Sequence, residues 1–356
     1  MIGNIIADMR NYITQTAVQI EAMRSPCPPV TPPAPTCWIV TDGNAGMESQ
    51  CLGLAEALGI VPQIKRIRLR APWEWLPPRL GVWINPLAGL DPRGDRLTPP
   101  WPDLLIATGR RTVALSVMIR RLSSKTVTVQ IQNPHYPASA FDLVVCPVHD
   151  RLRGANVMAT AGALHRVTRQ RLDAAAAEFC ETLAHLPRPL VAVLIGGANS
   201  AYRMDRSVMA QLAAGLRDLA KATGCGFALT PSRRTGADNI ATLRQELAGV
   251  AHSLWEGEEP NPYFGYLGLA DAVIVTSDSV NMVSEACAAQ KPVYVYDLPG
   301  GSAKFNAFHT AMRSSGAVRP FIPGQTLQLM SWTPPAFDDT ATVARAVKPL
   351  LILRNN

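Results

Sequence analysis

Short runs of apolar residues recur along the chain at intervals that predict strands separated by helices. In the first half, such runs lie at 37–41, 103–109, 126–132 and 141–147. Their length and their Val and Ile content are typical of strands buried on both faces of a parallel sheet. Between them, apolar residues three and four positions apart predict helices at 47–59 and 111–122. Residues 64–69 alternate apolar and basic side chains, which predicts a strand with one face in water.

The same alternation restarts after a long helical pattern near 164–185. Further apolar runs predict strands at 189–197, 226–232, 252–257, 271–279 and 292–298. Two successive β/α units predict an α/β fold of two Rossmann-like β/α/β domains that face each other across a cleft. We place the first domain at 36–187, the second at 188–330, and a C-terminal helix that crosses back to the first domain at 331–356. A ligand is expected at the carboxyl ends of the strands.

Residues 1–35 form a separate segment before the first strand. Ile5, Ile6, Met9, Ile13, Ile20 and Met23 recur mostly at helical spacing, and 26–35 contain six prolines. This predicts an amphipathic helix followed by a stiff, extended linker. The apolar stripe of the helix either docks on the rest of the chain, lies on a membrane surface or has no partner.

Cysteine usage and hydropathy favour the cytoplasm. The seven cysteines form no CxxC pair, which argues against a disulfide framework or a structural zinc site. No run reaches the roughly 18–20 apolar residues of a membrane-spanning helix. Asp8 and Glu21 interrupt the region where a secretory signal needs a continuous apolar core. We expect a cytoplasmic protein, either free or attached peripherally to the inner face of the membrane.

The excess positive charge is confined to one segment. Residues 61–121 hold eleven basic and four acidic side chains, a difference equal to the net charge of +7 of the whole chain. A nucleic-acid coat protein is basic throughout, so we expect no nucleic-acid partner. The same segment holds four of the seven tryptophans, and nine prolines lie between 62 and 102. This favours an anionic membrane surface or a lipid-linked acceptor as partner, or else a Pro-rich insertion whose tryptophans pack on the sheet.

Two loops of the second domain carry groups that bind phosphate. A glycine-rich turn follows the strand at 189–197, and a turn with two arginines follows the strand at 226–232. Glycines let the backbone approach an anion, and arginine forks bind phosphate oxygens in pairs. An exposed arginine pair alone is usually solvated surface, but two such loops at one sheet edge predict a diphosphate cradle. Its residues are Gly196, Gly197, Asn199, Ser200, Ser232, Arg233 and Arg234.

Further strand-end loops of this domain offer contacts for a nucleoside and a sugar. Glu285 follows the loop 276–279 by one to two helical turns, where a carboxylate can accept both hydroxyls of a ribose. Tyr263 either stacks on a base or packs between loops. Lys304 supplies a point charge beside two glycines. The candidate nucleoside and sugar site comprises Asn261, Tyr263, Ser277, Asp278, Ser279, Glu285, Gly301, Lys304 and Asn306.

The strand ends of the first domain supply an acceptor loop and candidate bases. The turn 42–46 leads into a helix, and its N–H groups suit an anion or a sugar hydroxyl, although a plain strand–helix turn has the same pattern. The acceptor loop comprises Gly43, Gly46, Glu48, Gly109 and Arg110. Asp42, His135 and His149 each follow a predicted strand and are the candidate general bases, unranked.

Several common site motifs are absent from the sequence. Neither GxxxxGK[ST] nor GxGxxG occurs, which argues against a P-loop nucleotidase and an ordinary dinucleotide dehydrogenase. The lack of HExxH excludes a zinc protease of that class. No DxD-like pair stands at a strand end. We therefore expect no metal and no resident cofactor, with a nucleotide-diphosphate sugar as substrate.

Several sequence blocks together resemble one known family over about 37–325. They are WIVTDGNAGMESQ, DLLIATGRRT, QIQNP, FDLVVCPVHD, GGANSAY, TPSRRT, NPYFGYLGLADAVIVTSDSVNMVSEA and PGGSAKF. The chain resembles the plant mitochondrial fission factors named for elongated mitochondria and their bacterial relatives. That family is in turn similar to glycosyltransferases of the GT-B type, above all the peptidoglycan N-acetylglucosaminyltransferase.

The resemblance implies an acceptor domain followed by a donor domain. GGANS is similar to the phosphate-side loop of that transferase, Glu285 stands in the ribose-binding position, and KFNA at 304–307 resembles the stretch that contacts the donor sugar. The turn at 41–50 lacks the transferase's Gly-Gly-His sequence. The resemblance therefore implies neither the acceptor nor the base.

We expect a GT-B-like glycosyltransferase that uses a nucleotide-diphosphate sugar, with a UDP-sugar as the first candidate. It would transfer the sugar without a metal to a cell-envelope or lipid-linked acceptor. The alternative is a non-catalytic GT-B-like scaffold that binds a nucleotide and acts through protein or membrane contacts. A nucleotide-sugar epimerase that holds a nicotinamide cofactor is disfavoured, because the chain has neither GxGxxG nor a YxxxK pair.

Overall fold

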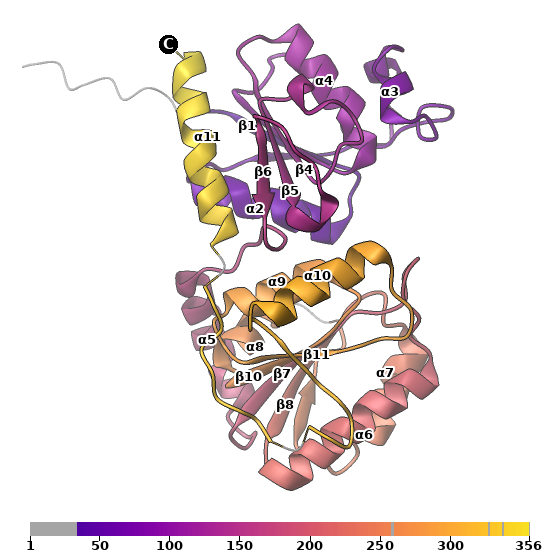
Figure 1. Ribbon diagram of the computed structural model, residues 1–356, viewed down its shortest axis with the longest axis vertical. Helices are drawn as coiled ribbons and strands as arrows, with labels where there is room; N and C mark the ends of the chain where they lie inside the picture. Colours follow the sequence, from indigo (N-terminus) through magenta and orange to yellow (C-terminus); the bar gives the residue numbers. More distant parts are fainter. Residues whose placement is uncertain (1–33, 258–259, 327, 337, 356) are drawn as a thin grey trace, which may run out of the picture. The chain divides into compact units, whose positions relative to one another are not determined.

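Two six-stranded parallel sheets, each packed against helices, make up the described part of the chain (Figure 1). The computed structural model describes residues 34–257, 260–326, 328–336 and 338–355. The predicted amphipathic helix and most of the proline-rich linker fall in 1–33, outside the described residues. No helix among the described residues is long and apolar enough to cross a membrane.

The first sheet has the strand order β2-β1-β3-β4-β5-β6. Its strands are β1 (Cys37–Thr41), β2 (Gln63–Arg66), β3 (Leu104–Thr108), β4 (Val127–Ile131), β5 (Leu143–Pro147) and β6 (Val157–Thr160). Every residue of β1, β3 and β4 is buried, as parallel strands covered on both faces must be. The helices of this half are α2 (Ala45–Leu58), the short α3 (Pro78–Gly81) and α4 (Val113–Leu122).

The second sheet has the order β12-β11-β10-β7-β8-β9. Its strands are β7 (Leu190–Ile195), β8 (Gly226–Pro231), β9 (His252–Leu254), β10 (Ala272–Thr276), β11 (Val293–Tyr296) and β12 (Arg319–Pro320). Its helices are α5 (Arg169–Leu183), α6 (Arg206–Thr223), α7 (Ala237–Glu246), α8 (Tyr263–Leu269), α9 (Val280–Ala288) and α10 (Ala303–Ser314). The two sheets confirm the predicted α/β class. Strands β6 and β12 and helices α3, α8 and α10 were not predicted.

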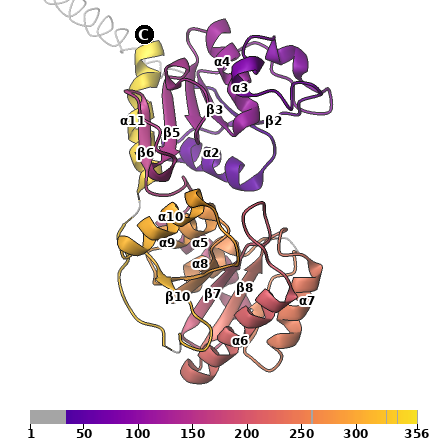
Figure 2. The same ribbon diagram turned by 45° about the vertical axis from the view of Figure 1, so that its right-hand side comes forward.

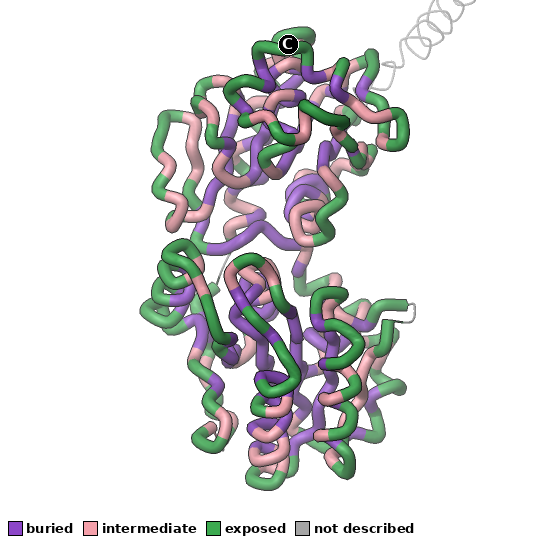
Figure 3. Tube along the Cα trace, turned by 90° about the vertical axis from the view of Figure 1, so that its right-hand side faces the viewer, coloured by how far each residue is buried: buried purple, intermediate pink, exposed green. Residues whose placement is uncertain are grey.

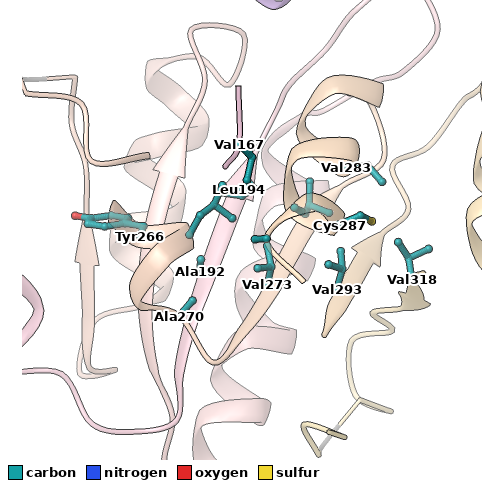
Figure 4. Close-up of a cluster of buried hydrophobic side chains, with 14 of the residues drawn as sticks. Val167, Ala192, Leu194, Tyr266, Ala270, Val273, Val283, Cys287, Val293 and Val318 are labelled. Carbon is teal, nitrogen blue, oxygen red and sulfur yellow. The ribbon is translucent and has the colours of Figure 1, made fainter. Parts of the chain in front are cut away.

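Helix α5 belongs to the second sheet. Val167, Leu172 and Leu183 lie in one buried cluster with strands β7, β10 and β11, part of which Figure 4 shows. Leu164, three residues earlier than Val167, lies in the cluster under the first sheet instead. The division between the two cores therefore falls near 165–166 rather than at 187, where the sequence placed the domain boundary. In both halves the buried stretches lie inside and exposed stretches surround them (Figure 3).

The C-terminal helix α11 (Asp339–Asn355) packs on the first half of the chain (Figure 1, Figure 2). Val343, Val347 and Leu351 are buried in the same cluster as Leu54 of α2. Near the end of the helix, Arg354 donates to the carbonyl oxygen of Thr126 at 2.7 Å and to the Asp142 carboxylate at 2.5 Å. The chain thus ends on the sheet with which its described part begins.

The Pro-rich stretch between β2 and β3 divides its tryptophans between two environments. Trp101 packs edge-to-face on Trp38 of β1 with ring centroids 5.9 Å apart, and Trp73 packs against Gly89. Trp75 and Trp83 are 69% and 88% exposed, and Leu80 and Ile84 beside them are also exposed. Packing on the body therefore accounts for only half of these tryptophans.

Candidate functional site

A buried carboxylate joins three loops at the carboxyl edge of the second sheet. Asp278 follows β10, and its side chain is fully buried. It accepts hydrogen bonds from the Gly197 N–H at 3.0 Å and from the Thr276 hydroxyl at 2.7 Å, and it pairs with the Arg234 guanidinium at 2.7 Å. The glycine-rich loop and the arginine loop, which follow β7 and β8, are thereby tied to β10.

The two glycines at the end of β7 are required by this close packing. A Cβ on Gly196 would lie 2.1 Å from an Asp278 carboxylate oxygen, and one on Gly197 would lie 2.1 Å from the Arg234 carbonyl oxygen. The Gly196 N–H donates to the Thr276 hydroxyl at 2.8 Å. The N–H groups predicted to hold a diphosphate are therefore engaged within the protein, and the glycines bring the loops together instead.

The arginine loop presents one tethered and one open guanidinium. Ser232 and Thr235 fix the loop by donating from their hydroxyls to the Gly196 carbonyl oxygen. Arg234, bound to Asp278, keeps 40% of its side chain exposed. Arg233 is exposed and has no ion-pair partner among the described residues. Arg233 and the outer side of Arg234 are therefore the groups left for an anion.

The remaining members of the predicted diphosphate cradle differ in accessibility. The Asn199 side chain closes its own turn, accepting from the N–H groups of Ala201 and Tyr202 at 2.8 and 2.9 Å. It also donates to the Asp278 carbonyl oxygen at 3.2 Å. Ser200 is exposed. Asn199 therefore shapes the loop, whereas the Ser200 hydroxyl faces solvent.

Glu285 is buried and already has two hydroxyl partners. Its carboxylate accepts from the Tyr263 hydroxyl at 2.7 Å and from Ser49 of α2 at 3.4 Å. Burial raises the pKa of Glu285, and the two hydroxyl donors oppose that rise. Tyr263 therefore does more than fill space between loops, because its hydroxyl anchors Glu285. Ribose hydroxyls at Glu285 would share the carboxylate oxygens with the Tyr263 and Ser49 hydroxyls.

The other predicted nucleoside-site residues act within the loop framework. Ser277 accepts from the Leu298 N–H at 2.9 Å, and its carbonyl oxygen lies 2.7 Å from His309 Nε2. The Ser279 hydroxyl caps α9 by accepting from the Met282 N–H, and Asn261 accepts from the Tyr263 N–H. Asn306 and Lys304, both on α10, are exposed, and Gly301 stands before this helix with φ +115°.

Lys304 makes a contact that links the two halves of the chain. Its ammonium pairs with Asp150, just after β5, at 2.7 Å, and the Asp150 side chain is only 6% exposed. Neighbouring His149 packs edge-to-face on Phe308 of α10. The His149 Nε2 atom is buried without a hydrogen-bond partner among the described residues, and burial lowers the pKa of this imidazole. A neutral imidazole with an unused nitrogen is suited to accept a proton.

The predicted acceptor loop is used to seat α2. The Asn44 side chain caps the helix by accepting from the N–H groups of Gly46 and Met47. A Cβ on Gly46 would lie 2.4 Å from the Asn281 amide nitrogen, so α2 and α9 approach closely there. Glu48 forms a two-bond ion pair with Arg66 at 2.9 and 2.6 Å. Gly109 has φ +84° and faces Met47, and Arg110 is exposed without an ion pair among the described residues.

The three candidate bases are not gathered at one point. Asp42 follows β1, His135 follows β4 and His149 follows β5, so the outer two stand three strand spacings, about 14 Å, apart at the sheet edge. His135 is exposed. Asp42 lies 3.7 Å from the Arg111 guanidinium. Asp42 therefore lies beside an arginine and His149 has a buried ring nitrogen, whereas His135 faces solvent.

The contacts between the two halves include residues that the sequence did not single out. Besides Ser49, they are Gln50, which donates to Asn281 at 3.0 Å, and Ser284, whose hydroxyl accepts from the Ala163 N–H at 2.9 Å. The signal in the sequence that could have identified these contacts is position along the chain. Ser49 and Gln50 lie one helical turn after a strand-end glycine turn, and Asp150 ends the block FDLVVCPVHD. Within the described residues, no group of three or more His, Cys, Asp or Glu side chains is placed to hold a metal.

Solved structures of other proteins share this two-sheet architecture. The structure of a UDP-GlcNAc 2-epimerase from Methanocaldococcus jannaschii has a TM-score of 0.54 and 11% identity, with 89% of this chain and 99% of that chain covered. The same organism's epimerase in complex with UDP-GlcNAc and UDP has a TM-score of 0.50 and 11% identity, covering 88% and 99%. At this identity the likeness shows the fold alone.

The sequence comparisons reach further. The mitochondrial fission protein ELM1 of Arabidopsis thaliana is 30% identical over 390 aligned residues, which cover 89% of this chain and 91% of that protein. The family model described as mitochondrial fission ELM1 matches residues 45–351, most of the chain. The blocks quoted above and the two-sheet fold agree with this match. The chain therefore belongs to the mitochondrial fission ELM1 family.

Proposed function

We propose that this protein binds a nucleotide-diphosphate sugar at the carboxyl edge of its second sheet and transfers the sugar to an acceptor. A UDP-sugar is the first candidate for this donor. The observation that supports the proposal is the Asp278 junction, which holds the glycine-rich and arginine loops together and leaves Arg233 and the outer side of Arg234 open. Guanidinium groups bind phosphate oxygens in pairs. The epimerases with this fold include one in complex with UDP-GlcNAc and UDP.

The transfer needs a base on one side of the sugar and cations on the other. The acceptor hydroxyl oxygen forms a bond to the anomeric carbon, the bond from that carbon to the diphosphate breaks, and the hydroxyl proton passes to the base. Asp42 and His149 are the candidates for this base. Arg233, Arg234 and Lys304 would stabilise the charge on the departing nucleoside diphosphate. No metal or resident cofactor is required for this step.

A non-catalytic, nucleotide-binding scaffold is the second candidate. It is favoured by the internal engagement of the Gly196 and Gly197 N–H groups, which leaves fewer donors for a diphosphate. The fold does not separate a transferase from an epimerase, because UDP-GlcNAc 2-epimerases share it. The two candidates differ in turnover and not in nucleotide binding.

Thermal unfolding with UDP, ADP, CMP and their sugars tests the donor site. We expect UDP and UDP-sugars to stabilise the protein, by about 2.7 kcal/mol at one hundred times the Kd. Arg233→Ala is expected to weaken UDP binding about tenfold, the effect of about 1.4 kcal/mol. Arg244→Ala removes an exposed arginine from α7, where it pairs with Glu256, and should leave UDP binding unchanged.

No stabilisation by any nucleotide at millimolar concentration would overturn the donor-site proposal. Stabilisation without hydrolysis or transfer of the sugar would favour the scaffold. Glu285→Ala gives a second readout, since it should weaken UDP-sugars and free UDP equally if the carboxylate contacts the ribose.

We also propose that the acceptor is lipid-linked and that the protein attaches peripherally to an anionic membrane. Trp75, Leu80, Trp83 and Ile84 form an exposed apolar group around α3, and Arg79 on α3 is exposed beside them. Exposed tryptophans next to basic residues suit the headgroup region of an anionic bilayer.

Co-sedimentation with vesicles tests this attachment. Binding to vesicles that contain phosphatidylglycerol should weaken with salt, and Trp75→Ser/Trp83→Ser should reduce it at least tenfold. Ile352→Ser, a change at a 63% exposed position on α11, is the matched control. Equal binding by all three proteins would contradict the membrane proposal and leave the donor site untouched.

A further inference from the structure

A cavity of about 520 Å³ opens in the first half of the chain, beside the candidate base Asp42. It lies among the loops that follow β1, β2 and β3 and the Pro-rich stretch. The charged residues that line it are Asp42, Arg66, Arg68, Glu74, Arg93 and Arg111. Its volume is within the range of small-molecule sites. None of the four arginines was among the predicted site residues.

Backbone pairing explains why the arginines converge. Beyond β2 the chain continues extended and pairs with 89–95: the Asp95 N–H donates to the Arg66 carbonyl oxygen at 3.0 Å, and the Asp91 N–H to that of Arg68 at 2.8 Å. Side chains alternate along extended chain, so Arg66 and Arg68 share one face. A Cβ on Gly94 would lie 2.6 Å from the Arg68 nitrogen, so glycine permits this pairing.

The arginines are held in place without using all their donors. Arg66 binds Glu48 through two bonds, and Arg93 binds Asp91 through two bonds, at 3.0 and 2.7 Å. A guanidinium has five N–H donors, so each such pair leaves three for a ligand. These ion pairs fix the two groups before any ligand arrives, which lowers the entropic cost of binding.

Arg68 and Arg111 are the less committed pair. The Arg68 side chain is exposed and makes no hydrogen bond or ion pair within the described residues. Arg111 is 48% exposed and lies 3.7 Å from Asp42, beyond hydrogen-bond distance. Both can turn toward an anion in the cavity with little loss of existing contacts.

The mixed lining selects the chemistry of the ligand. Four guanidinium groups favour a phosphoryl group, whose oxygens accept several N–H bonds at once. The carboxylates of Asp42 and Glu74 repel a bare anion but accept hydrogen bonds from hydroxyl groups. A ligand that carries both a phosphoryl group and hydroxyl groups satisfies the whole lining.

We propose that this cavity binds a phosphorylated carbohydrate, with its phosphoryl group on Arg68 and Arg111 and a hydroxyl at Asp42. The assignment of this cavity as the acceptor pocket rests on the proposed transferase function. Asp42 is then the base that faces the acceptor hydroxyl. As a binding site, the cavity requires nothing from the second sheet.

Calorimetric titration with glucose 1-phosphate, inorganic phosphate and glucose tests the proposal. The full chain is used with Arg233→Ala, which weakens the donor site as a competing phosphate site. We expect glucose 1-phosphate to bind more tightly than phosphate or glucose. Arg68→Gln/Arg111→Gln should weaken it at least tenfold, whereas Arg96→Gln/Arg121→Gln removes the same charge from exposed positions outside the lining and should leave it unchanged.

Asp42→Asn provides a readout of opposite sign. Loss of this carboxylate frees Arg111 and removes a repulsion, so inorganic phosphate should bind several-fold more tightly, while the preference for glucose 1-phosphate over phosphate falls. Equal losses in both double variants, or no binding of glucose 1-phosphate by the Arg233→Ala protein, would overturn the proposal. Both double variants change exposed arginines, so thermal unfolding should show them as stable as the starting protein.

The same proteins separate this proposal from the donor site and identify the source of the phosphate. If glucose 1-phosphate binds through Arg68 and Arg111, the cavity proposal stands even where UDP does not bind the wild type. If UDP binds but glucose 1-phosphate does not, only the donor-site proposal stands. Vesicles of phosphatidic acid show whether the phosphoryl group belongs to a lipid. It does if Arg68→Gln/Arg111→Gln weakens binding both to these vesicles and to glucose 1-phosphate, while Trp75→Ser/Trp83→Ser leaves the binding of glucose 1-phosphate unchanged. A defect with glucose 1-phosphate alone assigns it to a soluble sugar phosphate.

Discussion

Asp278→Asn is expected to lower the free energy of unfolding by about 2–4 kcal/mol, toward the loss found when one partner of a buried ion pair is removed. The carboxylate is fully buried, and the amide that replaces it lacks the negative charge that pairs with the Arg234 guanidinium. Its single oxygen also cannot accept both at the position bound by the Gly197 N–H and at the position bound by the Thr276 hydroxyl. The value lies below that of a fully buried pair because Arg234 is 40% exposed. UDP binding should fall with stability, because both loops of the proposed donor site lose their anchor. Urea unfolding and UDP titration measure the two effects.

Asp297→Asn is the matched control for this change. Asp297 also pairs with an arginine, Arg313, through two contacts of 2.7 Å, but its side chain is 58% exposed. An exposed ion pair contributes about 0–1 kcal/mol, so this variant should unfold almost as the wild type does. Equal losses in the two variants would contradict the role of Asp278 as the junction of the site.

Gly197→Ala is expected to cost about 3 kcal/mol or more, at or above the upper end of the range for overpacking. The added Cβ would lie 2.1 and 2.2 Å from the carbonyl oxygen and carbon of Arg234 and 2.7 Å from the Thr235 nitrogen. These are backbone atoms, which cannot rotate away as the end of a side chain can. The loops after β7 and β8 must separate, and UDP binding should be lost together with stability.

Ala198→Ser adds one heavy atom at the next position, where the side chain is exposed. Such a surface change is expected to alter stability by less than about 0.5 kcal/mol. Gly197→Ala with the stability of the wild type would mean that the two loops do not approach as described. Urea unfolding of the pair decides this.

The main strands of both sheets could be predicted from the sequence because each is a short apolar run with a clear beginning and end. The strand expected at 37–41 is β1, and those expected at 103–109 and 126–132 contain β3 and β4. Strand β6 was missed because Val157–Thr160 is only partly buried and its apolar run has only three residues, too few to predict a strand. Helix α8 was missed because seven residues are too few to establish a helical period.

The sequence predicted which strand-end loops carry the candidate site residues, but not the contacts between these loops. The sequence showed that Gly196, Arg234 and Asp278 follow parallel strands, and such strands end at one edge of a sheet. It did not show that Asp278 would bind the other loops, because a carboxylate at a strand end is as compatible with solvent or ligand as with a neighbouring loop. Glu285 was expected to be open to a ribose, and its bonds to Tyr263 and Ser49 depend on two other elements.

The sequence by itself determined the fold class, the family and the strand-end loops that carry polar residues, because hydrophobic periodicity and local motifs are properties of short stretches of chain. Only the tertiary structure decided which core holds α5, which tryptophans remain exposed and which glycines permit loops to touch. It also brought four arginines from separate loops to one cavity. These features depend on the distance between residues far apart in the chain, and no local pattern encodes that distance.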